Sequence, residues 1–150
     1  MVRKQATVAN EHMKIDTSTW TRFATTSNAD FYEIEPHVLA VVPFDGTTDD
    51  AGTAQESVTA QLQYLQTRGQ RAGVIVMMDQ VAQQDAGARA VYHDLPNPAF
   101  QVCFALVGST PFGRAVASIF IGINPPRVPT RFFATIEEAL AWIKTTFNSH

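Results

Sequence analysis

The sequence predicts a single α/β domain with a mostly parallel central sheet covered by helices. The first observation is the stretch Gly73–Tyr92, where a short β-branched apolar run ends at Asp79 and a helical pattern follows Asp85. An apolar run of this length between polar residues is typical of a strand buried on both faces. The second observation is the order β-β-α-β-α-β-α-β-α, because strands separated by helices imply right-handed crossovers and parallel pairing.

The start of the chain is predicted to form an arm outside the sheet. Residues 1–28 lack sustained periodicity and are rich in Thr, Ser and other polar residues. A mobile or loosely docked arm is therefore expected, with Trp20 and Phe23 attaching its end to the body. The remaining residues, 29–150, are predicted to form the one domain.

An antiparallel hairpin and a long amphipathic helix are predicted next. Phe31–Glu35 alternates between apolar and polar residues, as a half-buried edge strand does, and Val38–Val42 follows it across a short Pro-His turn. Asp49–Asp50 can cap a helix over Ala51–Arg68, whose apolar residues fall on one face. Gly69 is expected to end that helix.

The second half of the chain continues as alternating strands and helices. Asp85 is expected to cap the helix that follows the central strand. Gln101–Val107 is a further buried strand, Gly113–Ile123 an apolar helix and Arg131–Phe133 a short last strand. Thr135–Glu138 has the form of a capping box and is predicted to start the closing helix.

Composition narrows the classes of function. The net charge is −3 and the isoelectric point about 5.7, so binding to nucleic acid is not expected. Charged residues make up only 17% of the chain, which leaves room for a protein–protein surface. Cys103 is the single cysteine and is predicted to be a buried structural thiol in a reducing, cytoplasmic compartment. No apolar stretch approaches the length of a membrane span.

The residues that could support catalysis or bind a metal form no recognisable arrangement. His93 lies beside Asp94, but no hydroxyl or thiol has the setting of a nucleophile elbow, so a solvated helix position is the preferred interpretation. Asp45, Asp49 and Asp50 form an acidic loop without the pattern of a calcium site, and a solvated capping turn is expected there. No metal and no cofactor are predicted.

A glycine-containing turn from strand to helix is the best candidate for a small-ligand site. The amides of Ser109 and Thr110 open a helix and can bind an anion, with Arg114 and the more distant Arg131 adding positive charge. Pro111 removes one donor, and the lysine of a phosphate-binding loop is absent. A capped helix start with a solvent-facing arginine is the alternative.

The helix predicted over Gly113–Ile123 is apolar on more than one face. Such a helix is sandwiched in a core, or it is exposed at a subunit interface or a hydrophobic-ligand groove. A homodimer contact through Phe120 or Ile121 is one of the hypotheses this pattern raises.

The element order and the central stretch resemble the STAS domain, the fold of bacterial anti-sigma-factor antagonists. In that family the central strand leads to an Asp-hydroxyl-hydroxyl-Gly motif at a helix N-terminus, and the partner kinase phosphorylates the first hydroxyl. Aligned without a gap, Val81 matches the family's valine after the strand and Asp85 matches the motif aspartate. Ala86 then occupies the phospho-acceptor position, followed by Gly87 and Ala88.

This departure changes what the resemblance implies. An alanine methyl cannot carry phosphate, and the segment from Gly69 to Gly108 contains no Ser or Thr at all, while Tyr92 lies more than a turn into the helix. A switch based on charge inserted at the helix start is therefore not available. The resemblance implies a partner-binding surface without that switch, made of Gln80, Asp85, Ala86, Gly87 and Arg89.

A second resemblance spans most of the chain. Leu106–Arg114, Phe120–Pro125, Pro129–Phe133 and Glu137–Ile143 are similar to the corresponding segments of a group of small bacterial STAS-like proteins. The likeness extends from about residue 31 to 147. It implies the fold but brings no established activity.

We therefore expect a non-catalytic regulatory or protein-interaction module that binds a protein partner and forms a homodimer. Two alternatives remain open. One is a binder of a small hydrophobic or anionic ligand, by analogy with the CRAL-TRIO lipid-carrier fold. The other is an enzyme whose residues are not recognised.

Overall fold

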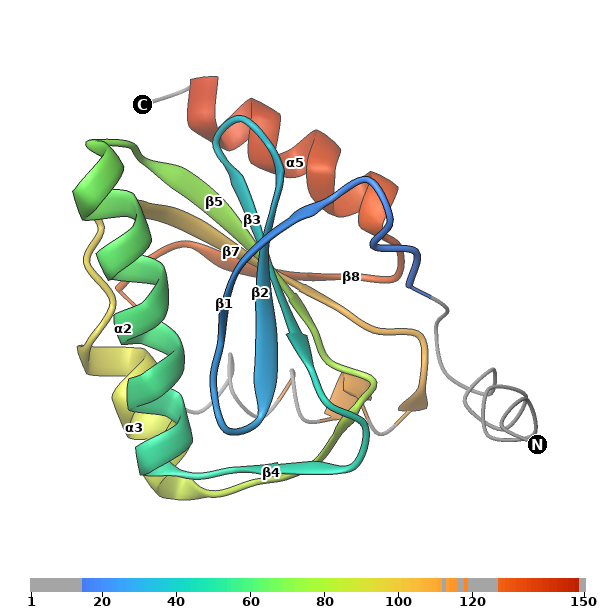
Figure 1. Ribbon diagram of the computed structural model, residues 1–150. Coiled ribbons are helices and arrows are strands. Elements are labelled where there is room, and N and C mark those ends of the chain that lie inside the picture. The colour runs from blue at the N-terminus through green and yellow to red at the C-terminus, as the bar shows by residue number, and fades with distance from the viewer. Residues whose placement is uncertain (1–14, 112, 116–117, 119–126, 149–150) are drawn as a thin grey trace.

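The structure is a computed structural model that describes residues 15–111, 113–115, 118 and 127–148 (Figure 1). Its main feature is a six-stranded sheet in the order β1-β2-β3-β5-β7-β8, accompanied by a two-stranded β4-β6 ribbon. In chain order the elements are β1 Thr21–Thr25, β2 Ala29–Glu35, β3 Val38–Pro43, β4 Thr47–Asp49, α2 Ala51–Arg68, β5 Ala72–Met77, β6 Val81–Gln84, α3 Ala86–Asp94, β7 Gln101–Val107, β8 Thr130–Phe133 and α5 Ile136–Asn148.

Strand pairing confirms the predicted fold class. β1, β2 and β3 pair antiparallel, whereas β3, β5, β7 and β8 pair parallel. β5 lies between β3 and β7, and its side chains are almost all buried, as predicted for the central strand. A parallel strand with helices on both sides must be apolar on both faces, which explains its unbroken apolar run.

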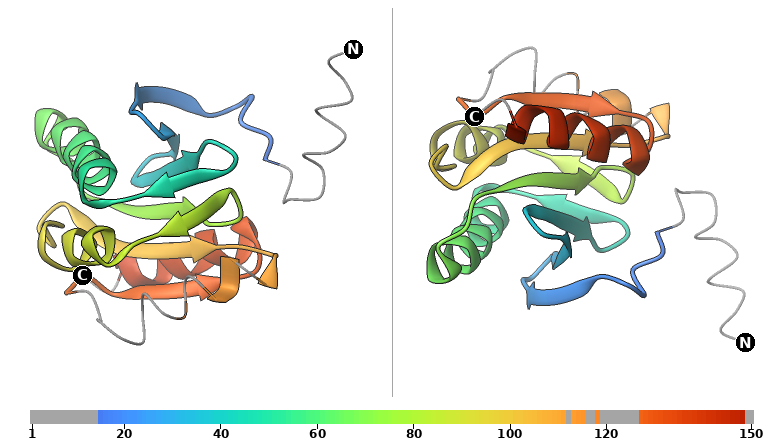
Figure 2. Two further views of the ribbon diagram at one scale, coloured as in Figure 1. Left: turned by 90° about the horizontal axis from the view of Figure 1, so that it is seen from below. Right: turned by 90° about the horizontal axis from the view of Figure 1, so that it is seen from above.

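Helices cover the two faces of the sheet separately (Figures 1 and 2). On one face α2 packs its Leu65 against residues of β2, β3 and β5, including Phe31 and Val74. On the other face α5 packs Ala139 and Ile143 against alternate residues of β3, β5 and β7. α2 and α3 run side by side on the first face. Two separate apolar cores therefore hold the layers together.

The helix ends follow the predicted chemistry. The Asp50 carboxylate accepts a hydrogen bond from the amide of Thr53 at 2.9 Å, and the Thr53 hydroxyl accepts one from the Asp50 amide at the same distance. Gly69 ends α2 in the left-handed conformation, with φ of 63°. Asp85 caps α3, and Thr135 accepts a hydrogen bond from the third residue after it at the start of α5. Each cap satisfies amide groups or carbonyl oxygens that the helix leaves unpaired.

The prediction of an arm over residues 1–28 is wrong for Thr21–Thr25. These residues form β1, the outer strand of the sheet, so β2 is an inner strand and not the predicted edge strand. The pairing of β1 with β2 shifts at a bulge between Arg22 and Ala24. A bulge breaks the alternation of buried and exposed side chains, and this removed the periodic signal that would have identified the strand.

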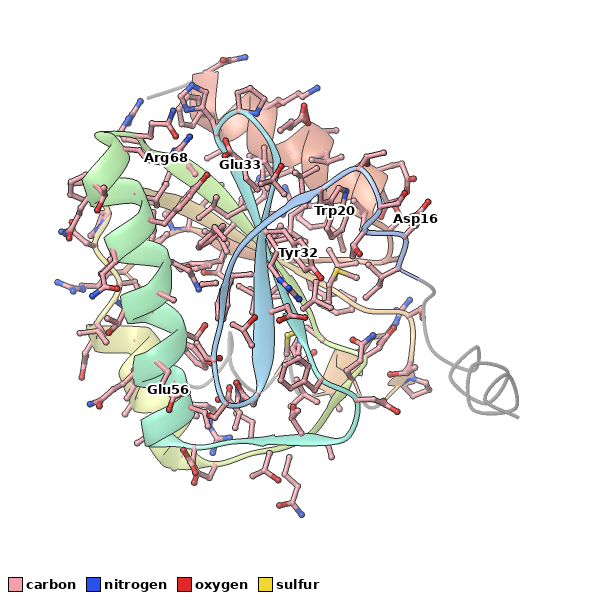
Figure 3. All side chains as sticks on the ribbon, in the orientation of Figure 1. Asp16, Trp20, Tyr32, Glu33, Glu56 and Arg68 are labelled. Carbon is pink, nitrogen blue, oxygen red and sulfur yellow. The ribbon has the colours of Figure 1, made fainter. Side chains whose placement is uncertain are left out.

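Trp20 and Phe23 attach this segment to the body, as predicted. Trp20 lies edge-on against the ring of Tyr32, with centroids 5.6 Å apart (Figure 3). Phe23 stacks on Tyr64 of α2 at 3.9 Å. The sequence also missed β4 and β6, because their residues were interpreted as connections. These two short strands pair in parallel next to the starts of α2 and α3.

Candidate functional site

The starts of α2 and α3 lie against each other at the end of the β4-β6 ribbon (lower left of Figure 1). A Cβ atom at Gly87 would lie 3.3 Å from the Cβ of Ala51, so the two helices approach closely at their first turns. The Asp85 carboxylate accepts a hydrogen bond from the amide of Ala88 at 2.9 Å. This arrangement fixes the orientation of Ala86, which is exposed at the first position of α3.

Most of the predicted partner-binding residues cluster here, although they differ in exposure. Asp85 and Ala86 are exposed and Gly87 is half-buried. Arg89 is held back by a hydrogen bond from its guanidinium to the carbonyl oxygen of Gln84 at 3.0 Å. Gln80 is half-buried before β6, and its side-chain oxygen is buried. The accessible part of the predicted surface is thus the start of α3.

Exposed, uncharged residues occupy the two helix starts and the strand that leads into α3. They come from the first turns of α2, from β6 and from α3, and Asp50 and Asp85 lie beside them. We name this surface the helix-start face. Its members are Ala51, Gly52, Gln55, Ala82, Gln83, Ala86 and Ala90.

The nearest hydroxyl on α3 belongs to Tyr92 and is directed into the protein. Tyr92 donates a hydrogen bond to a carboxylate oxygen of Asp49 at 2.7 Å. Burial, followed by the charge of Asp49, raises the pKa of Tyr92 well above its ordinary value. The phenol therefore does not replace the hydroxyl that is absent at Ala86.

The turn predicted to bind an external anion holds an internal one. The carboxylate of Asp79, at the end of β5, accepts hydrogen bonds from the amide and hydroxyl of Ser109 at 3.0 and 2.9 Å. It also accepts bonds from the amide and hydroxyl of Thr110 at 3.1 and 3.0 Å. A Cβ atom at Gly113 would lie only 2.8 Å from Asp79, so the chain closes tightly around this carboxylate. We name these contacts the Asp79 latch.

Hydrogen bonding decides the charge state of Asp79. Burial alone disfavours the charged form, and Asp79 is only 5% exposed. The amide and hydroxyl donors of Ser109 and Thr110 together outweigh that effect and lower the pKa of the carboxyl below its ordinary value. The sequence did contain a signal, because Asp79 and Ser109 each follow a buried strand and parallel strands end at the same edge of a sheet.

The structure does not bring Arg114 and Arg131 together. The Arg114 guanidinium lies over the ring of Phe132 at 5.7 Å, whereas that of Arg131 lies over Phe133 at 5.3 Å and Trp142 at 5.7 Å. Phe132 packs against Met78 and Leu106, on the face of the sheet that α3 covers. Phe133 packs against the core on the opposite face, which α5 covers. The two arginines therefore lie on opposite faces of β8.

Phe120 and Ile121, the residues predicted to form a dimer interface, lie outside the described residues. The homodimer stays a prediction.

Side chains of catalytic type are engaged in structural contacts. Burial raises the pKa of the Cys103 thiol to about 12, so the sulfur is protonated and packed in the core. His93 contacts the exposed carboxylate of Asp94 at 2.7 Å, and His37 contacts the carbonyl oxygen of Arg71 at 2.9 Å. Within the described ranges, no three His, Cys, Asp or Glu side chains come close enough to hold a metal ion. Nor does any described helix have the length and apolarity to cross a membrane.

Sequence reasoning also missed a cavity of about 60 Å³ between the α2-α3 layer and the sheet. Asp49 lies in its wall and is only 6% exposed, so the solvated turn predicted for this residue is wrong. Asp49 and Asp50 are adjacent, and only one of them can cap α2. Asp50 is the cap. The sequence therefore contained a signal that Asp49 has a different role. The other residues of the wall come from α2, β6 and α3, which no local pattern connects.

Fold and topology define the class of protein: an α/β domain with a mostly parallel central sheet, an N-terminal antiparallel hairpin and helices on both faces. Residues 32–147 match the model of the family described as "Domain of unknown function (DUF7793)", and the chain belongs to that family. No curated protein matches the sequence.

Among solved structures, the chain is similar to an uncharacterised protein of the DUF3478 family with a SpoIIAA-like fold from Shewanella loihica PV-4. The two are 9% identical with a TM-score of 0.47, and the match covers 87% of this chain and 99% of the other.

Proposed function

We propose that this protein is a non-catalytic, STAS-type interaction module whose protein partner docks on the helix-start face. The observation that supports this most directly is the exposed, uncharged composition of the helix-start face, which includes Ala86 at the position where the STAS resemblance places the regulatory motif. Depletion of charge in the centre of a surface patch is typical of protein interfaces. Rigid helix starts also bind a partner with little loss of conformational freedom.

The face operates without covalent switching at its centre. A phosphate would add roughly two negative charges at a helix start. Ala86 offers no oxygen to carry it, and the Tyr92 hydroxyl is bonded to Asp49. The module is therefore always in the state that corresponds to the unphosphorylated form of a STAS switch.

A non-catalytic role agrees with the contacts of the reactive side chains. The Cys103 thiol is protonated in the core, and the His93 imidazole bonds to an exposed carboxylate. Nucleophilic catalysis requires a nucleophile and a base within hydrogen-bond reach of each other. These two groups are instead used in packing and surface pairing.

A matched pair of substitutions tests the docking face. Ala86→Asp introduces a charge at the centre of the face, where a carboxylate at a helix start does not harm folding. Ala141→Asp makes the same chemical change on the exposed side of α5, on the opposite face of the sheet. Proteins captured from the native host by the wild-type chain are identified, and their affinities for the variants are measured by calorimetry.

Ala86→Asp is expected to weaken binding at least about tenfold, whereas Ala141→Asp leaves the affinity unchanged. Equal affinities of Ala86→Asp and the wild type would refute the placement of the partner. Turnover of a substrate by the purified chain would refute the non-catalytic role.

We also propose that the protein forms a homodimer through Phe120 and Ile121, in the segment Gly113–Ile123 for which the sequence predicts an apolar helix. The sequence pattern of that helix, apolar on more than one face, supports the proposal. Phe120→Glu should convert dimers to monomers in sedimentation velocity, because a buried unpaired charge opposes association. A dimer that persists in this variant, or a monomeric wild type, would contradict it.

A further inference from the structure

The cavity between the α2-α3 layer and the sheet has an apolar floor. Its volume is about 60 Å³, several times the roughly 10–15 Å³ that a cavity needs to hold one water molecule on this measure. The floor is formed by strands β3, β5 and β7, through Val41, Val76, Met78, Phe104 and Leu106. An apolar floor of this kind accommodates hydrocarbon better than water.

The opposite wall is polar and is built around the carboxylate of Asp49. It accepts hydrogen bonds from the Thr53 hydroxyl at 2.6 Å, the Tyr92 hydroxyl at 2.7 Å and the Gln84 amide nitrogen at 3.4 Å. All three donors are uncharged, and none of the described residues that line the cavity is Lys, Arg or His. A buried carboxylate is thus stabilised here by hydrogen bonds and not by a counter-charge.

A chain of buried hydrogen bonds leads to the same carboxylate. The Gln101 amide donates to Gln61 at 2.8 Å, and the Gln61 amide donates to Ser57 at 3.2 Å. Ser57 is hydrogen-bonded to Tyr92, and Tyr92 donates to Asp49. The donors in this chain are directed towards Asp49, so each bond strengthens the next and the series ends on the carboxylate at the cavity wall.

Two hydrogen-bond acceptors are left at this wall. A carboxylate has about four acceptor positions, and the three donors occupy three of them at Asp49. The side-chain oxygen of Gln84 is buried and has no partner among the described residues. Because the Gln84 amide nitrogen is bonded to Asp49, this oxygen lies close to the carboxylate. Among the described residues no donor reaches these two positions, so the wall can accept hydrogen bonds from a bound molecule.

We infer that the cavity is a binding site for a small primary alkylammonium. The ammonium group donates to Asp49 and to the Gln84 oxygen, and its charge neutralises the buried carboxylate. The short alkyl chain lies on the apolar floor. Anions are excluded because the carboxylate repels them. This site is separate from the helix-start face and does not depend on the proposed interaction function.

The inference is tested with three probes of equal length: n-propylamine, n-propanol and propionate, at neutral pH. The full chain is labelled with nitrogen-15, and its amide shifts are followed during each titration. Propylammonium is expected to produce saturable shifts at the cavity residues and to bind at least about tenfold more tightly than propanol. Propionate is expected to produce no saturable shift there.

Two variants test whether the polar wall of the cavity binds propylammonium. Asp49→Asn keeps the shape of the side chain and removes its charge, so the preference for propylammonium over propanol should fall to about equal affinity. Gln84→Leu lies on the short strand β6, outside the main sheet, and keeps the test valid if Asp49→Asn does not fold. This variant should lower the affinity for propylammonium several-fold, because it removes the unpartnered side-chain oxygen of Gln84.

Three results would overturn the inference. One is the absence of saturable shifts with propylammonium, which would mean that the cavity holds water only. Another is equal binding of all three probes. The third is propylammonium binding that neither variant changes, which would place the amine on exposed carboxylates.

Discussion

At the scale of single residues, Asp79 explains why a turn suited to anions needs no external ligand. Its carboxylate ends the central strand and receives the amides and hydroxyls of Ser109 and Thr110. Four charge-assisted hydrogen bonds connect the ends of β5 and β7. The latch thus fixes the position at which the chain leaves β7.

Removal of the Asp79 carboxylate should destabilise the protein. Asp79→Ala removes the shared acceptor of the Ser109 and Thr110 amides and hydroxyls and is expected to lower the free energy of unfolding by about 1–3 kcal/mol. Urea denaturation followed by tryptophan fluorescence measures the change. Asp94→Ala, which removes an exposed carboxylate, is the control and should change stability by less than about 0.5 kcal/mol.

The lowered pKa of Asp79 also predicts an acid dependence. A carboxyl whose pKa is lower in the folded than in the unfolded chain adds stability above its unfolded pKa, and this contribution is lost as the pH falls through the folded pKa. Asp79→Asn removes this contribution, so the difference in stability between wild type and Asp79→Asn should shrink below about pH 4. A constant difference from pH 7 to pH 3 would contradict the role of the charge.

At the scale of elements, the contact of β5 with α5 depends on a glycine. A Cβ atom at Gly73 would lie 2.5 Å from a methyl carbon of Ile143 and 3.1 Å from the sulfur of Cys103. Ile143 is 1% exposed, so it has no room to move away. The helix can therefore pack on the central strand only because residue 73 lacks a side chain.

A double-mutant cycle tests this contact. Gly73→Ala should lower the free energy of unfolding by about 1–3 kcal/mol, because the new methyl group overpacks the core. Ile143→Ala should lower it by about 2–5 kcal/mol, because it leaves a cavity. The double variant should lose clearly less than the sum, because the new methyl fills space vacated by Ile143. Unfolding free energies that add to within about 0.5 kcal/mol would show that the two positions are independent.

At the scale of the whole molecule, buried weak acids make stability depend on alkaline pH. The pKa of Cys103 is raised to about 12 by burial, and that of Tyr64 to about 12 by burial and by its hydrogen bond to Glu33 (Figure 3). The pKa of Tyr92 is raised further above its ordinary value. The folded chain therefore keeps protons that the unfolded chain loses.

Stability should be highest below about pH 9 and should decline between about pH 9 and pH 12. The sign follows from linkage, because the unfolded chain binds fewer protons than the folded chain in this range. Cys103→Ala should reduce the decline, as measured by urea denaturation at increasing pH. A stability that is independent of pH from 8 to 11 would contradict the prediction.

Signals confined to neighbouring residues were sufficient to predict much of the fold. The cap at Asp50, the left-handed Gly69 and the cap at Asp85 are local chemistry. The apolar run of β5 indicated burial on both faces. β1 was missed because the bulge between Arg22 and Ala24 breaks its alternation. Periodicity therefore predicted the strands that show a clear alternation or an apolar run, and it failed at β1, which shows neither.

The candidate sites were less predictable. The sequence located Ala86 at a helix start because Asp85 caps the helix in a recognisable way. It did not predict that Asp79 would fill the Ser109–Thr110 turn, or that Asp49 would be buried in a cavity wall. In the sequence, Asp79 and Asp49 are acidic residues beside turns like many others. Their hydrogen-bond partners lie on other elements of the structure.

The amino-acid sequence alone determined the order of β2, β3, α2, β5, α3, β7, β8 and α5, the caps of their helices and the identity of the buried central strand. These depend on side-chain periodicity and on capping groups within a few residues of each other. Only the tertiary structure decided which polar groups meet. Asp79 reaches its partners some 30 positions along the chain because the parallel register aligns Met77 with Val107, and Asp49 meets Tyr92 across 43 positions. Such contacts follow from the packing of whole layers, which no local pattern encodes.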